Sequence, residues 1–159
     1  MFGKLIFLLG TYGSGKSTYA RTFASTLGCR IVHTDALRGP DLPPILVNRV
    51  VERALQQAVV ELRSGRTVVF DTTGESPTVR ARALKLAACF QAPTKLVVMG
   101  TDVETCVQRQ SAPGRDERLV VGEDVVRRTF ASIQDQMDGI EREGWGEIQT
   151  VAAGASYDG

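Results

Sequence analysis

Residues 10–17 read Gly-Thr-Tyr-Gly-Ser-Gly-Lys-Ser and match the phosphate-binding loop pattern G-x-x-x-x-G-K-[ST]. An apolar run from Leu5 to Leu9 precedes this stretch, and apolar residues at helical spacing follow it from Tyr19 to Leu27. The sequence therefore supplies the preceding strand and the following helix that such a loop requires. The alternative is a glycine-rich turn with a solvated lysine, but a turn of that kind has no need of the adjacent Lys-Ser pair.

The residue types explain how this loop would bind a polyphosphate. Backbone N–H groups must converge on the anion, and Gly10, Gly13 and Gly15 reach the required φ values without a Cβ penalty. The positive end of the following helix faces the same anion. We expect Lys16 to contact the β and γ phosphates of ATP and the Ser17 hydroxyl to hold Mg²⁺. The predicted nucleotide site comprises Gly13, Ser14, Gly15, Lys16, Ser17 and Thr18.

Strands and helices alternate along the rest of the chain. Largely apolar stretches predict strands over residues 5–9, 67–71 and 94–99, and the shorter stretches 30–33 and 147–151 are also assigned as strands. Helical spacing predicts a long helix over 45–63, with a broad apolar face that includes Ile45, and another helix over 123–137. Further helices are expected to start at Ser76-Pro77 and at Asp102. This order predicts an α/β P-loop phosphotransferase fold: a parallel sheet of about five strands with helices on both faces and an arginine-bearing lid.

Length and composition indicate a single domain over residues 1–159, of which 43% are hydrophobic. No segment approaches the roughly 18 apolar residues that a membrane span needs, so no membrane partner is expected. Cys29, Cys89 and Cys106 form an odd set without metal-type spacing. Reduced, buried thiols in a cytoplasmic protein fit this pattern.

The charge is distributed unevenly along the chain. Residues 1–100 contain 13 Lys and Arg and 6 Asp and Glu, a net charge of +7, whereas residues 101–159 contain 6 and 12, a net charge of −6. A basic half suits a polyanionic partner such as a nucleic acid or a nucleotide. Solvated helix faces explain the scattered basic residues equally well.

Acidic residues follow two of the predicted strands and are candidates for the chemistry. Asp35 follows the strand 30–33, which we expect beside the strand of the loop, and is the candidate base for an acceptor hydroxyl. Arg38 lies one turn further on and can bind a phosphate of the acceptor. The alternatives are a capping role for Asp35 and a solvated Arg38. Asp71 ends the third strand and either holds a water on Mg²⁺ or supports the loop.

The polar segment 109–122 carries three arginines and is predicted to form a lid over the nucleotide. Arg109 is the candidate for stacking on the adenine, and Arg115 for contacting the transferring phosphate. A solvated loop is the alternative, because neighbouring acids neutralise part of the arginine charge. The single histidine, His33, is assigned to its strand rather than to catalysis, and Trp145 to packing.

Four pieces of the chain together resemble the P-loop polynucleotide 5′-hydroxyl kinases of phage and bacterial end-healing systems. They are Gly-Ser-Gly-Lys-Ser-Thr at 13–18, Asp35 with Arg38, Asp71-Thr72-Thr73, and the Cys106-x-x-Arg109 helix that leads into the lid. The resemblance spans most of the chain, and the Asp-x-x-Arg pair is its most discriminating motif. It implies that Lys16 and Ser17 bind ATP and Mg²⁺, that Asp35 is the general base on the 5′-OH, and that Arg38 contacts the acceptor phosphate. It further implies that a lid arginine, Arg115 or Arg118, contacts the donor phosphates.

The sequence thus predicts an ATP- and Mg²⁺-dependent kinase that phosphorylates the 5′-OH end of DNA or RNA. A homo-oligomer is compatible with this prediction. The second hypothesis is a small-molecule kinase of the gluconate or antibiotic type, which shares the sheet, the loop and the lid. The third is a nucleotide-dependent switch protein without an acceptor, against which the Asp35 and Arg38 pair argues.

Overall fold

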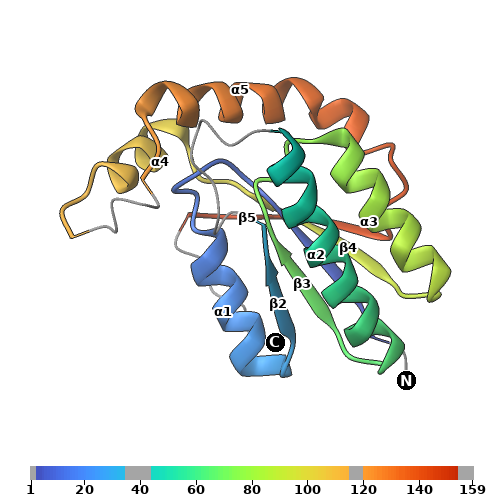
Figure 1. The fold of residues 1–159 in the computed structure, drawn as a ribbon. Coiled ribbons are helices and arrows are strands. Elements are labelled where there is room, and N and C mark those ends of the chain that lie inside the picture. Colours follow the sequence, from blue (N-terminus) through green and yellow to red (C-terminus); the bar gives the residue numbers. More distant parts are fainter. Residues whose placement is uncertain (1–2, 35–43, 115–119, 154–159) are drawn as a thin grey trace.

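The computed structural model describes residues 3–34, 44–114 and 120–153 (Figure 1). The strands are β1 (Leu5–Leu9), β2 (Arg30–His33), β3 (Val68–Asp71), β4 (Thr94–Met99) and β5 (Glu147–Val151). The helices are α1 (Lys16–Leu27), α2 (Pro44–Arg63), α3 (Pro77–Cys89), α4 (Val103–Gln110) and α5 (Glu123–Ile140). The expected elements are therefore confirmed, with small differences at their ends: β3 begins one residue later, and α5 continues to Ile140.

The five strands form one parallel sheet in the order β2-β3-β1-β4-β5. The α/β fold with a parallel sheet is confirmed. The expected position of β2 is wrong, because β3 and not β2 pairs with β1. Consequently Asp71, at the end of β3, lies on the strand next to the phosphate loop, and β2 is one strand further out. Both strands are short and end at or near an acid, but β2 has polar residues at both ends, Arg30 and His33, which suits the edge position it takes, whereas β3 is fully buried.

Residues of β1 alternate between the two faces of the sheet, as a strand period of two dictates. Leu5, Phe7 and Leu9 belong to one buried cluster, which includes residues of α2, α3 and α5. Ile6 and Leu8 belong to a second cluster, which includes Tyr19, Ala20 and Phe23 of α1. Helices therefore cover both faces, with α1 on one side of the sheet and α2 and α3 on the other (Figure 1).

The predicted helix ends are confirmed by their capping geometry. The Ser76 side chain accepts a hydrogen bond from the Val79 N–H at 3.3 Å, and Pro77 occupies the first turn of α3. Asp102 accepts from the Thr105 N–H at 2.9 Å and starts α4. Gly28 ends α1 in the left-handed conformation, with φ 63°.

Two expectations about burial are wrong. Ile45 was assigned to the buried face of α2, but 63% of its surface is exposed; among the described side chains, Val51 is the first of α2 in the buried core cluster. Cys29 and Cys106 are buried as expected, whereas Cys89, at the end of α3, is exposed. Among the described helices, none combines the length and the apolar character needed to cross a membrane.

Candidate active site

The phosphate loop connects β1 to α1, and its glycines are required for two different reasons. Gly13 and Gly15 have φ values of 79° and 96°, which L-residues with a Cβ rarely adopt. At Gly10 the constraint is space, since a Cβ would lie 2.6 Å from Ser14 Oγ and 2.9 Å from Met99 Cβ. The loop is also tied to the neighbouring strand end, because the Gly10 N–H donates to the Thr73 carbonyl oxygen at 3.0 Å.

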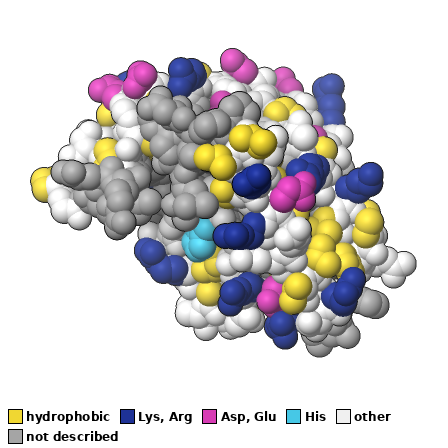
Figure 2. Space-filling model, viewed as in Figure 1, with side chains coloured by type: hydrophobic (Ala, Val, Ile, Leu, Met, Phe, Trp, Pro, Cys, Tyr) yellow, Lys and Arg dark blue, Asp and Glu magenta, His cyan; other side chains and the backbone are white. Residues whose placement is uncertain are grey.

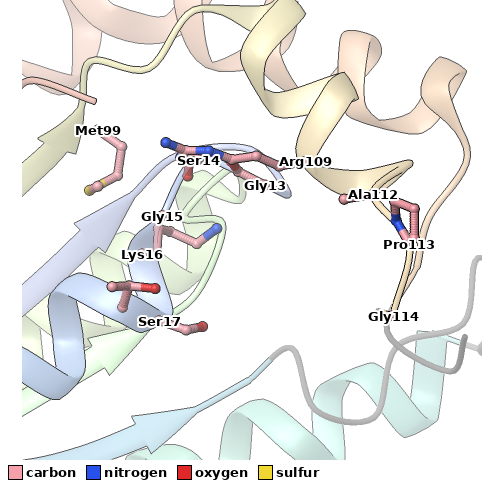
Figure 3. Close-up of a pocket in the computed structure, with 11 residues that line it drawn as sticks. Gly13, Ser14, Gly15, Lys16, Ser17, Met99, Arg109, Ala112, Pro113 and Gly114 are labelled. Carbon is pink, nitrogen blue, oxygen red and sulfur yellow. Dashed lines mark hydrogen bonds between the residues drawn. The ribbon is translucent and has the colours of Figure 1, made fainter. Parts of the chain in front are cut away.

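Lys16 is the first residue of α1 and is only 5% exposed. Its Nζ donates a hydrogen bond to the Thr11 carbonyl oxygen at 3.1 Å, across the loop. A buried ammonium group this close to several backbone N–H groups makes the loop strongly positive. In Figure 3 the Lys16 side chain points toward the open space beside the loop.

Ser17, Asp71 and His33 meet where the ends of α1, β3 and β2 come together. Ser17 Oγ donates to Asp71 Oδ2 at 2.7 Å, and His33 Nδ1 lies 3.0 Å from the same oxygen. His33 and Asp71 are paired in the register of β2 and β3, which brings their side chains together at the sheet edge. His33 therefore belongs to this cluster as well as to its strand. Both residues end their strands in the sequence. Their contact could be predicted only if β2 and β3 were known to be neighbours in the sheet.

The Asp71 carboxylate carries a negative charge that its surroundings stabilise. Burial raises the pKa of this carboxyl, but the hydrogen bond with His33, the charge of Lys16 and the hydrogen bond from Ser17 outweigh it, so the pKa lies below its ordinary value. The second oxygen, Oδ1, is buried and has no hydrogen-bond partner among the described residues. An ionised carboxylate with one uncommitted oxygen beside a serine hydroxyl fits Mg²⁺, which prefers oxygen ligands.

No group of three or more His, Cys, Asp or Glu side chains able to hold a metal occurs within residues 3–34, 44–114 and 120–153. A cation here would thus take only one or two ligands from the described protein residues and the rest from phosphates and waters. This is the usual situation of Mg²⁺ in nucleotide sites.

A pocket of about 500 Å³ lies in front of the loop (Figure 3). Its size is typical of small-ligand sites. Residues 13–18 line it on one side, and Met99, Arg109 and residues 112–114 complete the lining. The predicted nucleotide residues Gly13, Ser14, Gly15, Lys16, Ser17, Thr18 and Arg109 thus all border one pocket.

Arg109 and Ser14 hold particular positions in this pocket. Arg109 lies in the last turn of α4, and its guanidinium donates to the Gly13 carbonyl oxygen at 3.3 Å. It therefore contacts the backbone of the phosphate loop. Ser14 is 2% exposed, and its Oγ has no partner among the described groups, whereas its carbonyl oxygen accepts from Thr101 Oγ1 at 2.8 Å.

A second buried contact group, which the sequence did not indicate, supports the segment 72–75 after β3. Arg80 of α3 is 2% exposed and donates to the carbonyl oxygens of Gly74 at 2.6 Å and Glu75 at 3.1 Å. The same guanidinium binds Glu143 at 2.9 Å and Gln136 at 2.8 Å. Its partners lie 56 and 63 residues away along the chain, so no local pattern reveals them.

Four predicted site residues lie outside the described part of the chain: Asp35, Arg38, Arg115 and Arg118. The described residues do include the neighbour of Asp35. The backbone N–H of Thr34 donates to the Asp71 carbonyl oxygen at 3.2 Å. Of the proposed lid, residues 109–110 belong to α4, and residues 111–114 and 120–122 are described as non-helical.

Comparison with known proteins identifies relatives of this arrangement. An uncharacterized protein of Mycobacterium tuberculosis, Rv2004c, is 33% identical to this chain over 102 residues. The match covers 54% of this chain and 20% of that protein, so the chain spans about a fifth of the length of this curated relative.

Solved structures share the architecture at lower identity. A structure of the Pnkp1/Rnl/Hen1 RNA repair complex has a TM-score of 0.74 and 23% identity, and covers 87% of this chain and 46% of that chain. A gluconokinase from Sinorhizobium meliloti 1021 has a TM-score of 0.63 and 17% identity, and covers 97% of this chain and 85% of that chain. The likeness at these identities shows the fold. The family model described as AAA domain matches residues 5–140, and the chain therefore belongs to that family and has the P-loop kinase fold.

Proposed function

We propose that the protein is an ATP- and Mg²⁺-dependent kinase that transfers the γ-phosphate of ATP to the 5′-OH end of DNA or RNA. The observation that carries the proposal is the contact between β2 and β3 at their carboxyl ends. Thr34 is anchored to Asp71 by its backbone N–H at 3.2 Å, and Asp71 is itself bonded to Ser17 of the phosphate loop. The Asp35-x-x-Arg38 motif therefore begins one residue after a point fixed to the donor site.

On the donor side, the loop N–H groups and Lys16 bind and orient the β and γ phosphates. Ser17 and Asp71 would hold the cation, directly or through a water, and the bound Mg²⁺ would offset charge on the phosphate oxygens. Arg109 is proposed to contact the adenine, and Arg115 or Arg118 the donor phosphates. These residues hold the phosphoryl group in place and exclude water from it.

On the acceptor side, Asp35 is proposed to accept the proton of the 5′-hydroxyl, and Arg38 to bind the acceptor phosphate. The new bond forms between the 5′ oxygen and the γ phosphorus, and the bond between that phosphorus and the bridging oxygen breaks. ADP leaves with the electron pair of that bond, and the proton remains on Asp35. A carboxylate base of this type contributes about 10²–10⁴-fold to the rate.

The second candidate is a small-molecule kinase. It is favoured by the gluconokinase likeness, which covers 85% of the gluconokinase chain, whereas the RNA repair protein is matched over 46% of its length. A non-catalytic switch is less well supported, because such a protein has no use for the Asp35-x-x-Arg38 motif.

The test is a transfer assay with ATP labelled at the γ-phosphate and a panel of acceptors: 5′-OH DNA, 5′-OH RNA, gluconate and mononucleosides. The proposal predicts label on the polynucleotide ends. Label on a small molecule only would replace it with the second candidate, and no transfer to any acceptor would favour the switch.

The Asp35→Ala variant tests the role of the proposed base. It should lower transfer by about 10²–10⁴-fold while ATP affinity, measured by equilibrium binding, stays within a factor of about two. The control is Asp41→Ala, which removes a carboxylate six residues further along the sequence that has no assigned role. This variant is expected to retain transfer. Full activity in Asp35→Ala would remove this residue from the base role.

A further inference from the structure

The outer face of α2 carries exposed arginines that have no ionic partner among the described residues. Arg49 and Arg53 lie four residues apart and thus share one side of the helix. Both side chains are exposed, and neither makes an ion pair with any residue in the described segments. Uncompensated guanidinium groups on a surface helix attract an anion.

The acids of the same helix do not offset these arginines, because each is already paired with a residue outside the helix. Glu52 binds Arg82 of α3, and Glu61 binds Arg66 in the turn before β3. The positive charge of Arg49 and Arg53 therefore remains available at the helix surface.

The sheet order turns the charge asymmetry of the sequence into an asymmetry in space. α2 packs on β2 and β3, at one end of the strand order, whereas β5, which belongs to residues 101–159, lies at the other end. The net charge of residues 1–100 is +7 and that of residues 101–159 is −6. In Figure 2, Lys and Arg side chains spread over the face that carries α2 and lie on both sides of the histidine. Most Asp and Glu side chains in this view lie along the upper edge, where α5 runs. A polyanion is thus attracted to the α2 side and repelled from the α5 side.

The direction of α2 connects this basic face to the donor site. Because α2 joins two parallel strands, it runs antiparallel to them and begins at the sheet edge where the phosphate loop lies (Figure 1). Arg49 and Arg53 are about 7 Å and 13 Å along the helix axis from Pro44, at a rise of about 1.5 Å per residue. Ile45, 63% exposed, offers apolar surface between these arginines and the start of the helix.

We infer that the outer face of α2, through Arg49 and Arg53, binds the sugar-phosphate backbone of a single-stranded polynucleotide whose 5′ end occupies the active site. This inference rests on the proposed function and extends it from the reacting end to the following nucleotides. A chain with one negative charge per nucleotide meets two cations in succession along the helix, whereas a small acceptor does not reach them. Near the start of α2, the exposed residues include Ile45, Leu46 and Arg49, and the exposed acid that follows them, Glu52, is paired with Arg82.

The test compares the length dependence of phosphorylation in the Arg49→Gln/Arg53→Gln double variant and in the wild-type protein. The acceptors are 5′-OH oligonucleotides of two and twelve nucleotides, at several salt concentrations. The double variant should lower kcat/KM for the twelve-nucleotide acceptor by about tenfold or more, and reduce the slope of log kcat/KM against log salt by about 1.4. Activity on the dinucleotide and the KM for ATP should not change.

Arg142→Gln is the matched control, because Arg142 is an exposed arginine beyond α5, on the acidic part of the chain. It should leave the length dependence and the salt slope as in the wild type. An equal loss in Arg142→Gln and in a single Arg49→Gln variant would contradict the inference, because net charge alone would then explain the effect.

The outcomes separate the inference from the proposed function. If the wild-type protein phosphorylates no oligonucleotide, the proposed function fails, and the inference fails with it. If it phosphorylates oligonucleotides and the double variant behaves as the wild type at every length, only the inference fails. A loss confined to the longer acceptor supports both.

Discussion

Two loops leave the carboxyl edge of the sheet side by side, and they use their polar groups in opposite ways. The phosphate loop directs Lys16 and Ser17 toward a pocket of about 500 Å³. The segment 72–75 after β3 instead directs its carbonyl oxygens into the protein, where those of Gly74 and Glu75 accept from Arg80. The two loops are joined by the hydrogen bond from the Gly10 N–H to the Thr73 carbonyl oxygen at 3.0 Å.

This difference shows how the binding loop can remain shaped for an anion that is not part of the protein. Backbone groups reserved for a ligand cannot stabilise their own conformation, so neighbouring groups must hold it. The segment after β3 is suited to that role, because Arg80 links it to two more residues. They are Gln136, near the C-terminal end of α5, and Glu143, just after that helix. We therefore expect substitutions in the first loop to affect activity, and substitutions behind the second to affect stability.

The largest expected effect belongs to the phosphate loop. Lys16→Met should lower phosphoryl transfer by about 10³–10⁵-fold, because a cation on the transferring phosphate is lost. The free energy of unfolding should change by about 1 kcal/mol or less, since the only hydrogen bond lost within the described residues is the one to Thr11. Kinetic assays and urea unfolding measure the two quantities.

Lys4→Met is a suitable control for this prediction. Lys4 lies just before the N-terminal end of β1, whereas the phosphate loop follows its C-terminal end. The surface ion pair of Lys4 with Glu147 spans 3.5 Å. Transfer should stay within a factor of about two, because exposed pairs contribute little and the site is remote. A Lys16→Met protein that unfolds readily would contradict the division between the two loops.

The second prediction concerns stability. Arg80→Met should lower the free energy of unfolding by about 3–5 kcal/mol, because the partly buried Glu143 carboxylate loses its cation and the carbonyl oxygens of Gly74 and Glu75 lose their donor. Arg82→Met, on the same helix, breaks a surface pair with Glu52 and should cost less than about 1 kcal/mol. Urea denaturation measures the free energy of unfolding of both variants. An equal loss of stability in the two would show that the Arg80 contacts contribute no more than a surface ion pair.

A further variant tests the cause of that loss. The Glu143→Gln substitution in the Arg80→Met background removes the unpaired charge and should recover part of the stability. No recovery would indicate that the cost arises from the lost carbonyl contacts of Gly74 and Glu75 instead.

These two loops also mark what could be predicted from the sequence. The phosphate loop is a local motif: its glycines, Lys16 and Ser17 lie within eight residues, and each has a role that its chemistry explains. The strands were predicted for the same reason, since apolar runs are local. The order of β2 and β3 was not, because it depends on which strand β1 meets in space.

The same physical reason explains the residues that were missed. His33 joins the site through its register with Asp71, and the side-chain partners of Arg80 lie 56 and 63 residues away along the chain. Contacts that assemble from distant positions leave no spacing to recognise. The acceptor residues Asp35 and Arg38 were predicted from a short motif, and their roles remain predictions because they lie outside the described residues.

The smallest expected effect tests the hydrogen bond between the two loops, from the Gly10 N–H to the Thr73 carbonyl oxygen. Gly74 has a φ of 72°, and a Cβ there would lie 2.7 Å from the Leu9 side chain and 2.9 Å from the Phe7 ring. Gly74→Ala should therefore cost about 2–3 kcal/mol of stability, from the backbone conformation and the close contacts together. Gly28→Ala has a similar φ of 63° with nothing within 4 Å of the added carbon, so it should cost only about 1 kcal/mol.

Activity measurements on this pair of variants show whether the segment after β3 positions the phosphate loop. If it does, a shift of residues 72–75 displaces the Thr73 carbonyl that holds Gly10, and the KM for ATP should rise severalfold in Gly74→Ala. Gly28→Ala should keep the KM of the wild type, since Gly28 lies at the far end of α1. An unchanged KM in both variants, measured where both are folded, would mean that the phosphate loop holds its shape without its neighbour.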